Sequence, residues 1–128
     1  MRRLFLFAAA FAFAAPAAAQ DWRTAPEYDV LLTAYDIQPG EIRLQADRPV
    51  RLRFVNTSNI PLRFSAKKFF KSAQLRNRDG SVVQDGMISV QPLATETVVL
   101  VPKAGRYKTG GGTYVLRRLG MRGRIVVQ

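Results

Sequence analysis

The chemistry open to this chain of 128 residues is limited, because it contains no cysteine and no histidine. Thiolates and imidazoles are the usual nucleophiles, general bases and soft metal ligands of proteins. The nine Asp and Glu residues show no close pairing that suggests acid–base catalysis, and no serine lies in a nucleophile-elbow sequence. We therefore expect a protein that is not an enzyme and that holds no cofactor.

One segment could still bind a ligand. Gly110, Gly111 and Gly112 form a glycine run, and Arg117 and Arg118 follow it. Backbone N–H groups of a glycine-rich loop can hold an anion, and guanidinium groups suit carboxylates and phosphates. The alternative is a plain loop with solvated charges, since the segment is not a phosphate-loop motif. These five residues are the candidate binding site.

Methionine offers a second possibility. Met87 and Met121 lie beyond the N-terminal region, and their thioethers, with neighbouring carboxylates, could hold a soft ion such as Cu(I) weakly. Both positions also suit the filling of a core. An accessory metal-handling protein for copper or iron is therefore the alternative hypothesis.

The N-terminal region has the pattern of an export signal. Arg2 and Arg3 precede an apolar run over 4–15, and small residues lead up to Ala19. The run is shorter than the roughly 20 residues that span a bilayer. We predict cleavage after Ala19, a periplasmic location and one domain over 20–128. The arginine pair also resembles a twin-arginine signal, so the export route stays open.

Charge points to anionic partners. Loss of Arg2 and Arg3 with the signal would lower the net charge from +11 to +9, and 13 of the 18 remaining basic residues are arginine. Export argues against nucleic acid and favours lipid headgroups, lipopolysaccharide or an acidic protein. Arg51 and Arg53 alternate with apolar residues, which predicts the outward face of a strand. The sequence leaves open whether the cations form one patch or are dispersed.

Alternation of apolar and polar residues predicts a β-protein. We expect strands at 30–37, 42–47, 50–55, 97–101 and 124–127, with turn residues between them. The segment Thr97–Val101 is almost entirely apolar and β-branched, which is typical of a strand buried on both faces. Many short strands at this spacing indicate a sandwich or barrel.

A short helix is expected within Ser65–Ala73, where few residues are β-branched. Ser65 is the expected N-cap, and Phe69 and Phe70 are expected to pack partly against the sheets. The polar stretch 74–85 that follows is expected to be a loop.

Four segments, in order, resemble the cupredoxins, and more narrowly the small exported proteins with an iron-uptake-type cupredoxin domain. They are Pro39–Asn56, Ile60–Phe70, Leu100–Lys108 and Leu119–Val127. The resemblance covers about residues 29–128. It implies an all-β, Greek-key sandwich with one short helix, whose last hairpin lies within 105–127.

The resemblance also implies where copper ligands would lie. A type 1 site uses two imidazoles, a thiolate and a weak methionine. The imidazoles would fall at Leu62 and near Thr113 or Leu116, the thiolate within the glycine run at Gly111, and the thioether at Met121. Since the chain has no Cys or His, only the methionine position is retained. We therefore expect Leu62 to be repacked as core, and the site to bind no copper of this type.

These observations lead to one hypothesis. We expect a monomeric periplasmic binding protein that docks an acidic protein or an anionic envelope surface through a basic face that includes the loop 110–118.

Overall fold

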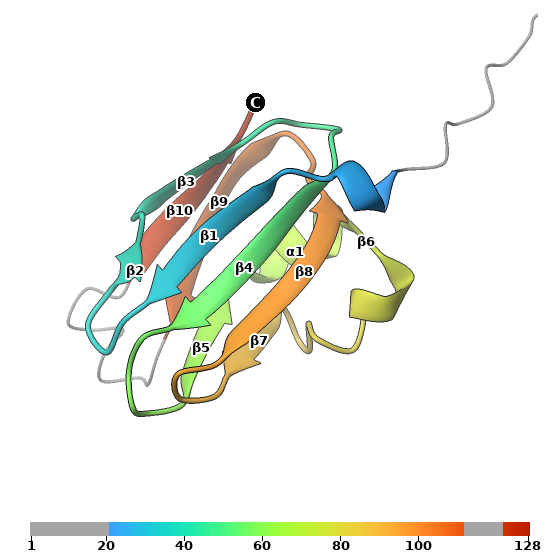
Figure 1. The fold of residues 1–128 in the computed structure, drawn as a ribbon. Coiled ribbons are helices and arrows are strands. Elements are labelled where there is room, and N and C mark those ends of the chain that lie inside the picture. Colours follow the sequence, from blue (N-terminus) through green and yellow to red (C-terminus); the bar gives the residue numbers. More distant parts are fainter. Residues whose placement is uncertain (1–20, 112–121) are drawn as a thin grey trace, which may run out of the picture.

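A computed structural model describes residues 21–111 and 122–128 of the chain. They form a β-sandwich of two five-stranded sheets with one short α-helix at its margin (Figure 1). The predicted export signal over 1–19 and the residues 112–121 lie outside the described part. Among the residues described, no helix is long and apolar enough to cross a membrane.

The first sheet has the strand order β2-β1-β4-β8-β6. Its strands are β1 (Glu27–Leu32), β2 (Ile37–Gln38), β4 (Val50–Asn56), β6 (Gln74–Leu75) and β8 (Thr95–Val101). β4 runs parallel to β1 and antiparallel to β8. β2 pairs with β1 only at Leu31 and Leu32, so the first part of β1 has no strand on that side among the described residues.

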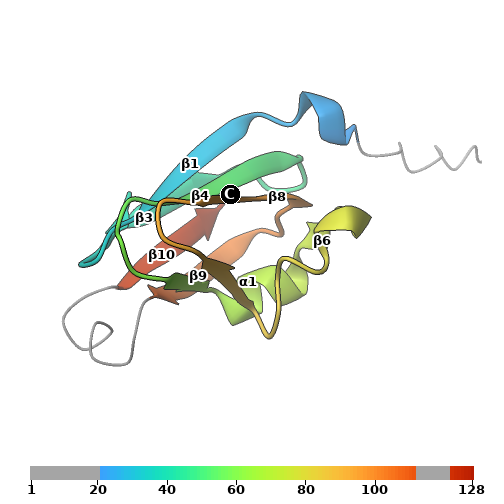
Figure 2. The same cartoon turned by 60° about the horizontal axis from the view of Figure 1, so that its bottom comes forward.

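The second sheet has the strand order β3-β10-β9-β5-β7. Its strands are β3 (Glu41–Leu44), β5 (Leu62–Ser65), β7 (Met87–Val90), β9 (Gly105–Gly111) and β10 (Arg122–Val127). β9 and β10 are antiparallel, as the predicted final hairpin requires. The chain first passes from the first sheet to the second between β2 and β3 and then alternates between the two sheets up to β9, and Figure 2 shows the two layers from below.

The core lies between the sheets and follows the alternation in the sequence. In β4, Val50, Leu52 and Phe54 are buried, whereas Arg51 and Arg53 are only partly buried on the outward face, as predicted. The Phe54 ring lies 4.6 Å from that of Phe64 on β5, measured between centroids. Aromatic contact across the sandwich therefore joins the two layers.

One predicted strand is two elements. The expected strand over 30–37 ends at Leu32, where a turn begins before β2. In that turn the Thr33 backbone N–H donates to the Asp36 carbonyl at 3.0 Å, and the Thr33 hydroxyl donates to the Asp36 carboxylate at 2.6 Å. Thr and Asp side chains often close turns through hydrogen bonds to residues nearby in the chain.

The short helix is present, but its predicted cap is wrong. α1 spans Lys67–Ser72, its N-cap position is Ala66, and no side chain caps it. Ser65 is instead the last residue of β5 and pairs with Met87. Phe69 and Phe70 are buried rather than partly packed, and the Phe69 ring lies 5.4 Å from that of Tyr107.

The segment expected to be a plain loop instead pairs along the edge of β8. It contains β6 and the 3-10 helix η2 (Asn77–Asp79), while a second 3-10 helix, η1 (Trp22–Thr24), precedes β1. The Asp79 carboxylate accepts from Arg76 Nε at 2.9 Å and from the Val99 backbone N–H at 2.9 Å. β8 itself is buried on both faces along Val98–Val101, as predicted.

Candidate functional site

The structure describes two of the positions that the resemblance assigned to copper ligands, Leu62 and Gly111, and both are closely packed. Leu62 is 1% exposed and belongs to the core cluster. Gly111 ends β9 opposite Phe64, and a Cβ atom at Gly111 would lie 2.6 Å from the carbonyl oxygen of Arg63. No side chain, a thiol included, fits there unless β5 moves. Leu116 and Met121 lie outside the described residues.

Asn56 organises the loop that leads to Leu62. Its side chain is 1% exposed, and its Nδ2 donates to the carbonyls of Ile60 at 2.8 Å and Val90 at 3.0 Å. Its Oδ1 accepts from the Ser58 backbone N–H at 2.9 Å and from the Ser58 hydroxyl at 2.7 Å. All four hydrogen-bonding positions of the amide are therefore used within the protein.

The glycine run is divided between strand and connection. Gly110 and Gly111 are buried strand residues at the end of β9, and Gly110 pairs with Arg122 on one side and Ser65 on the other. Gly112, Arg117 and Arg118 lie outside the described residues.

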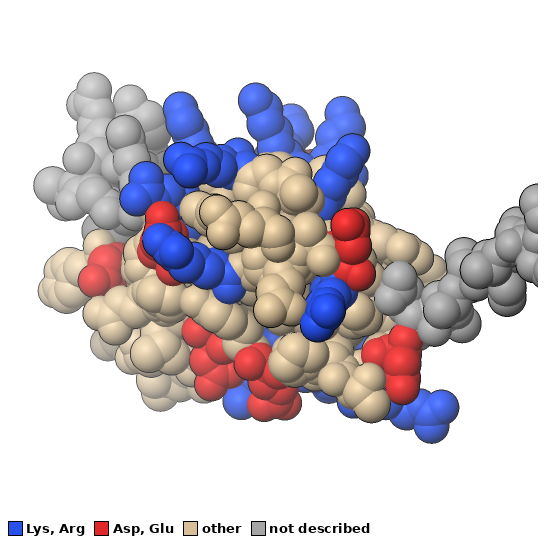
Figure 3. Space-filling model, turned by 90° about the horizontal axis from the view of Figure 1, so that it is seen from above, with Lys and Arg blue, Asp and Glu red and all other residues tan. Residues whose placement is uncertain are grey.

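Cations gather on the outer face of the second sheet. Five exposed basic side chains alternate with inward-facing residues along four of its strands: Arg43 on β3, Arg63 on β5, Arg106 and Lys108 on β9, and Arg124 on β10. We call these five residues the basic face. Figure 3 shows a row of Lys and Arg along the upper margin, the side of the second sheet, while acidic side chains and further Lys and Arg lie across the middle and lower part of the view. Five cations thus share this face, while the other described Lys and Arg residues lie elsewhere on the molecule.

One carboxylate lies within the basic face. Glu41 accepts a hydrogen bond from Arg43 Nε at 2.8 Å and forms an ion pair with Arg124, whose Nε lies 2.7 Å from the carboxylate. The hydrogen bond from Arg43, followed by the charges of Arg43 and Arg124, lowers the pKa of the Glu41 carboxyl below its ordinary value. Glu41 therefore holds these two guanidinium groups in place while it remains ionised.

A second pair within the basic face, Lys108 and Arg124, is electrostatically unfavourable to the fold. Lys108 lies directly opposite Arg124 in the strand register, and like charges in that position destabilise a sheet. Within the part of the chain that the structure describes, Lys108 forms no ion pair. Stability alone therefore does not account for a lysine here.

The outer face of the first sheet is balanced by contrast. Arg53 on β4 lies 3.5 Å from the Asp29 carboxylate and 3.8 Å from the Glu27 carboxylate, both on β1. With Arg51 beside them, two cations and two anions share this face. The two sides of the sandwich therefore differ in net charge.

Exposed apolar side chains gather at one end of the sandwich, on the loops that follow β1, β4 and β7. Tyr35 is 79% exposed, Leu93 77% and Ile60 39%, on the three loops that follow those strands. The Leu93 backbone N–H donates to the Ser58 carbonyl at 3.1 Å, and its φ is 56°. Leucine rarely adopts this left-handed backbone. The sequence had placed Tyr35 within the strand expected over 30–37, and it gave no sign of exposed apolar groups at the three loops.

Met87 lies beside a polar hollow of about 450 Å³ that Asp85, Glu96 and Arg63 also line. Over the ranges 21–111 and 122–128, no group of three or more His, Cys, Asp or Glu residues could hold a metal ion. The Arg63 guanidinium adds positive charge to the hollow, which opposes cation binding.

Solved structures share this fold, although their sequences differ widely. Auracyanin B aligns with a TM-score of 0.59 and 16% identity, over 81% of this chain and 89% of that one. Auracyanin A, a "blue" copper protein from Chloroflexus aurantiacus, gives a TM-score of 0.56 and 15% identity, over 81% of this chain and 100% of that one. A multi-copper oxidase from Pseudomonas thermotolerans gives 0.58 and 18%, over 80% of this chain and 29% of that one.

No family model and no curated protein sequence matches the chain. The structural likeness nevertheless confirms the predicted cupredoxin-like β-sandwich.

Proposed function

We propose that this protein is a periplasmic binding module that docks an acidic protein or an anionic envelope surface through its basic face. The observation that carries the proposal is the one-sided charge: the second sheet presents five cations around one carboxylate, while the first sheet presents paired charges. The proposal includes Arg117 and Arg118 on sequence grounds, because they fall between β9 and β10 in the chain.

Binding rather than catalysis fits the residues available. The cations are exposed on rigid strands, so little conformational entropy beyond that of their own side chains is lost on contact. Arginine, which dominates the face, pairs with carboxylates and phosphates through two parallel hydrogen bonds. The whole chain offers no thiol or imidazole for nucleophilic or redox chemistry.

Charge reversal tests the proposal. The double variant Arg106→Glu, Lys108→Glu should bind phosphatidylglycerol vesicles or poly-L-glutamate at least tenfold more weakly than wild type, since each cation near an anionic surface contributes about 1 kcal/mol. The matched control is Arg23→Glu, Arg78→Glu, which makes the same change in net charge at exposed sites away from the basic face. Equal losses in the two variants would show that only net charge matters and would contradict the proposal.

A salt series and a charge reversal in the loop extend this test. Wild-type binding should fall steeply between low and moderate salt, because contacts between exposed charges are screened. Charge reversal at Arg117 and Arg118 should weaken binding if the connection takes part; unchanged affinity removes the loop, but not the sheet, from the proposal.

The alternative is a metal-handling protein that binds copper or iron weakly through methionine and carboxylates. The observation in its favour is that Met87, Asp85 and Glu96 line one hollow. Calorimetric titration with Cu(I) and Fe(II), repeated with Met87→Leu and Met121→Leu, distinguishes the two functions. Stoichiometric binding that either variant abolishes would favour the alternative.

A further inference from the structure

The second sheet ends in an open edge next to the basic face. β3 is its terminal strand, and no described strand pairs with its outer side. The Leu44 carbonyl accepts from the Gln128 N–H at 3.1 Å, so the backbone of Leu44 faces β10. Successive residues of a strand point their N–H and C=O groups to opposite edges. The backbone groups of Arg43 and Gln45 therefore point outward, away from β10.

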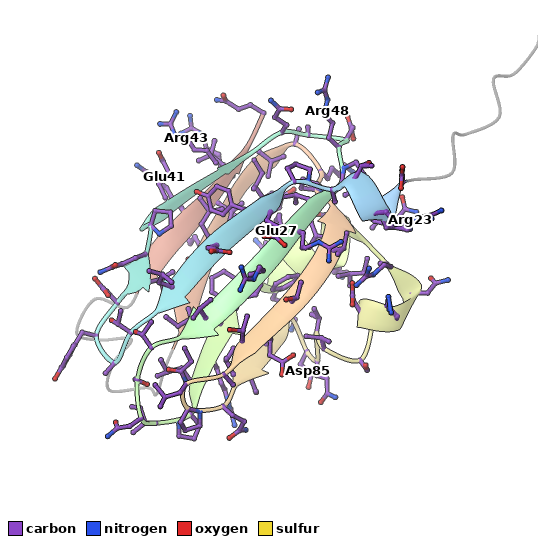
Figure 4. The ribbon with its side chains drawn as sticks, viewed as in Figure 1. Arg23, Glu27, Glu41, Arg43, Arg48 and Asp85 are labelled. Atoms are coloured by element: carbon purple, nitrogen blue, oxygen red, sulfur yellow. The ribbon has the colours of Figure 1, made fainter. Side chains whose placement is uncertain are left out.

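A cavity of about 350 Å³ opens beside this edge, between β3 and the start of β1. Apolar groups make up half of its lining: Ala25, Pro26, Tyr28, Leu44, Pro49 and Val50. Arg43 and Arg48 lie on the β3 side of the opening, and Glu27 lies on the β1 side (Figure 4). A hollow that combines apolar groups with polar groups at its rim has the character of a binding site.

We propose that the edge of β3 binds an extended, acidic segment of a partner protein as an added strand. The side chains of such a strand alternate between the two faces of the sheet. One set would enter the cavity, so apolar residues suit it. The other set would join the basic face beside Arg43, where cross-strand pairing favours a carboxylate. The segment thus alternates acidic and apolar residues.

Charge selects β3 over the neighbouring edge of β1. The free part of that edge carries the exposed carboxylates of Glu27 and Asp29, which repel an acidic segment. Its remaining part is already paired with β2. On β3 the single carboxylate of Glu41 is paired with Arg43, and Arg48 lies nearby, so this edge carries no excess negative charge. Its outer side is open throughout Glu41–Leu44 in the described chain.

This inference rests on the proposed function, because Arg43 belongs to the basic face, but it requires a peptide backbone. A fluorescein-labelled heptapeptide that alternates four glutamates with valine, leucine and valine is the probe. Its control has the same composition with the glutamates grouped at one end. The alternating peptide should bind at least fivefold more tightly, because only it presents apolar groups to the cavity and carboxylates to Arg43 together.

Amide hydrogen exchange in the wild-type protein gives a direct readout. Without peptide, the amides of Arg43 and Gln45 should exchange rapidly, whereas that of Leu44 is protected by β10. Saturating alternating peptide should slow Arg43 and Gln45 at least tenfold and leave Leu44 unchanged. Binding without this alternate protection would overturn strand addition.

A substitution at Gln45 removes one outward N–H donor while β3 stays paired with β10. Gln45→Pro deletes the outward N–H and keeps the inward pairing of Leu44, and proline is tolerated on an edge strand. It should weaken the alternating peptide about fivefold relative to Gln45→Ala, the loss of one hydrogen bond. Circular dichroism checks that the Gln45→Pro variant folds. If the variant does not fold, the hydrogen-exchange experiment on the wild-type protein still tests strand addition.

The outcomes separate the two proposals. If both peptides bind equally and Gln45→Pro changes nothing, while Arg106→Glu, Lys108→Glu weakens both, the basic face binds anions but strand addition is wrong. If neither peptide nor vesicles of phosphatidylglycerol bind, both proposals fall.

Discussion

Replacement of Asn56 by alanine should lower the free energy of unfolding by about 3 kcal/mol, since four hydrogen bonds are lost and net contributions are near 1 kcal/mol each with partial compensation. The amide ties the loop 57–61 to β7 through Ile60 and Val90, and it orders Ser58. The variant leaves the Val90 carbonyl without this buried donor. The Ile60 carbonyl still accepts from the Ser58 hydroxyl at 3.0 Å, which limits the loss.

Urea denaturation followed by far-ultraviolet circular dichroism measures this change. About 3 kcal/mol is a large part of the 5–15 kcal/mol that stabilises a typical domain. The matched control is Thr57→Val in the same loop, which removes a single side-chain bond, from the Thr57 hydroxyl to the Leu32 carbonyl at 3.2 Å. It should cost no more than about 1 kcal/mol.

A loss below about 1 kcal/mol for Asn56→Ala would refute the reasoning. It would mean that water or a rearranged loop satisfies the freed groups, so that the buried amide adds little to stability. A loss no larger than that of Thr57→Val would refute it in the same way.

Three further substitutions should change the stability of the protein in different directions. Leu93→Gly should stabilise the protein by up to about 1 kcal/mol in thermal unfolding, because φ is 56° and the side chain is exposed; a loss of stability would mean that the leucine packs in solution. Gly111→Ala should destabilise it by about 1–3 kcal/mol, because the new Cβ would meet the Arg63 carbonyl at 2.6 Å; an unchanged midpoint would contradict the close approach of β9 to β5. Glu41→Gln should reduce stability near neutral pH, where the carboxylate binds Arg43, and the difference from wild type should vanish as the pH falls. The sign follows from the lowered pKa of Glu41, since stability from such a group is present above the unfolded-state pKa and lost as the pH falls through the folded one. A difference that persists at pH 2 in urea denaturation would count against this ion pairing.

Local patterns predicted the strands well where one face is buried. The alternation from Val50 to Asn56 matches β4, and the resemblance identified the hairpin of β9 and β10. The N-cap prediction at Ser65 was wrong because strand pairing with Met87 and Gly110 continues through that residue. A capping preference is worth about 1 kcal/mol, which a ladder on both sides outweighs.

Features built by distant segments were out of reach of the sequence. The segment beside the edge of β8 is held there by Asp79, whose carboxylate accepts from the Val99 N–H, a contact that no local pattern encodes. The clustering of cations depends on register, which brings Arg124 beside Lys108 and Glu41. From the sequence alone, the same residues were also compatible with a dispersed, solvated surface.

The unequal charge of the two sheets also bears on how a partner is approached. Excess positive charge on the second sheet, opposite a balanced first sheet, gives the described sandwich an electric dipole that runs across its layers. In the field of an anionic body the molecule turns before contact, so a larger share of collisions presents β3, β9 and β10 first. Such steering raises association rates tenfold or more at low ionic strength, and dissociation rates respond much less. Orientation is thus set during diffusion, ahead of any contact between side chains.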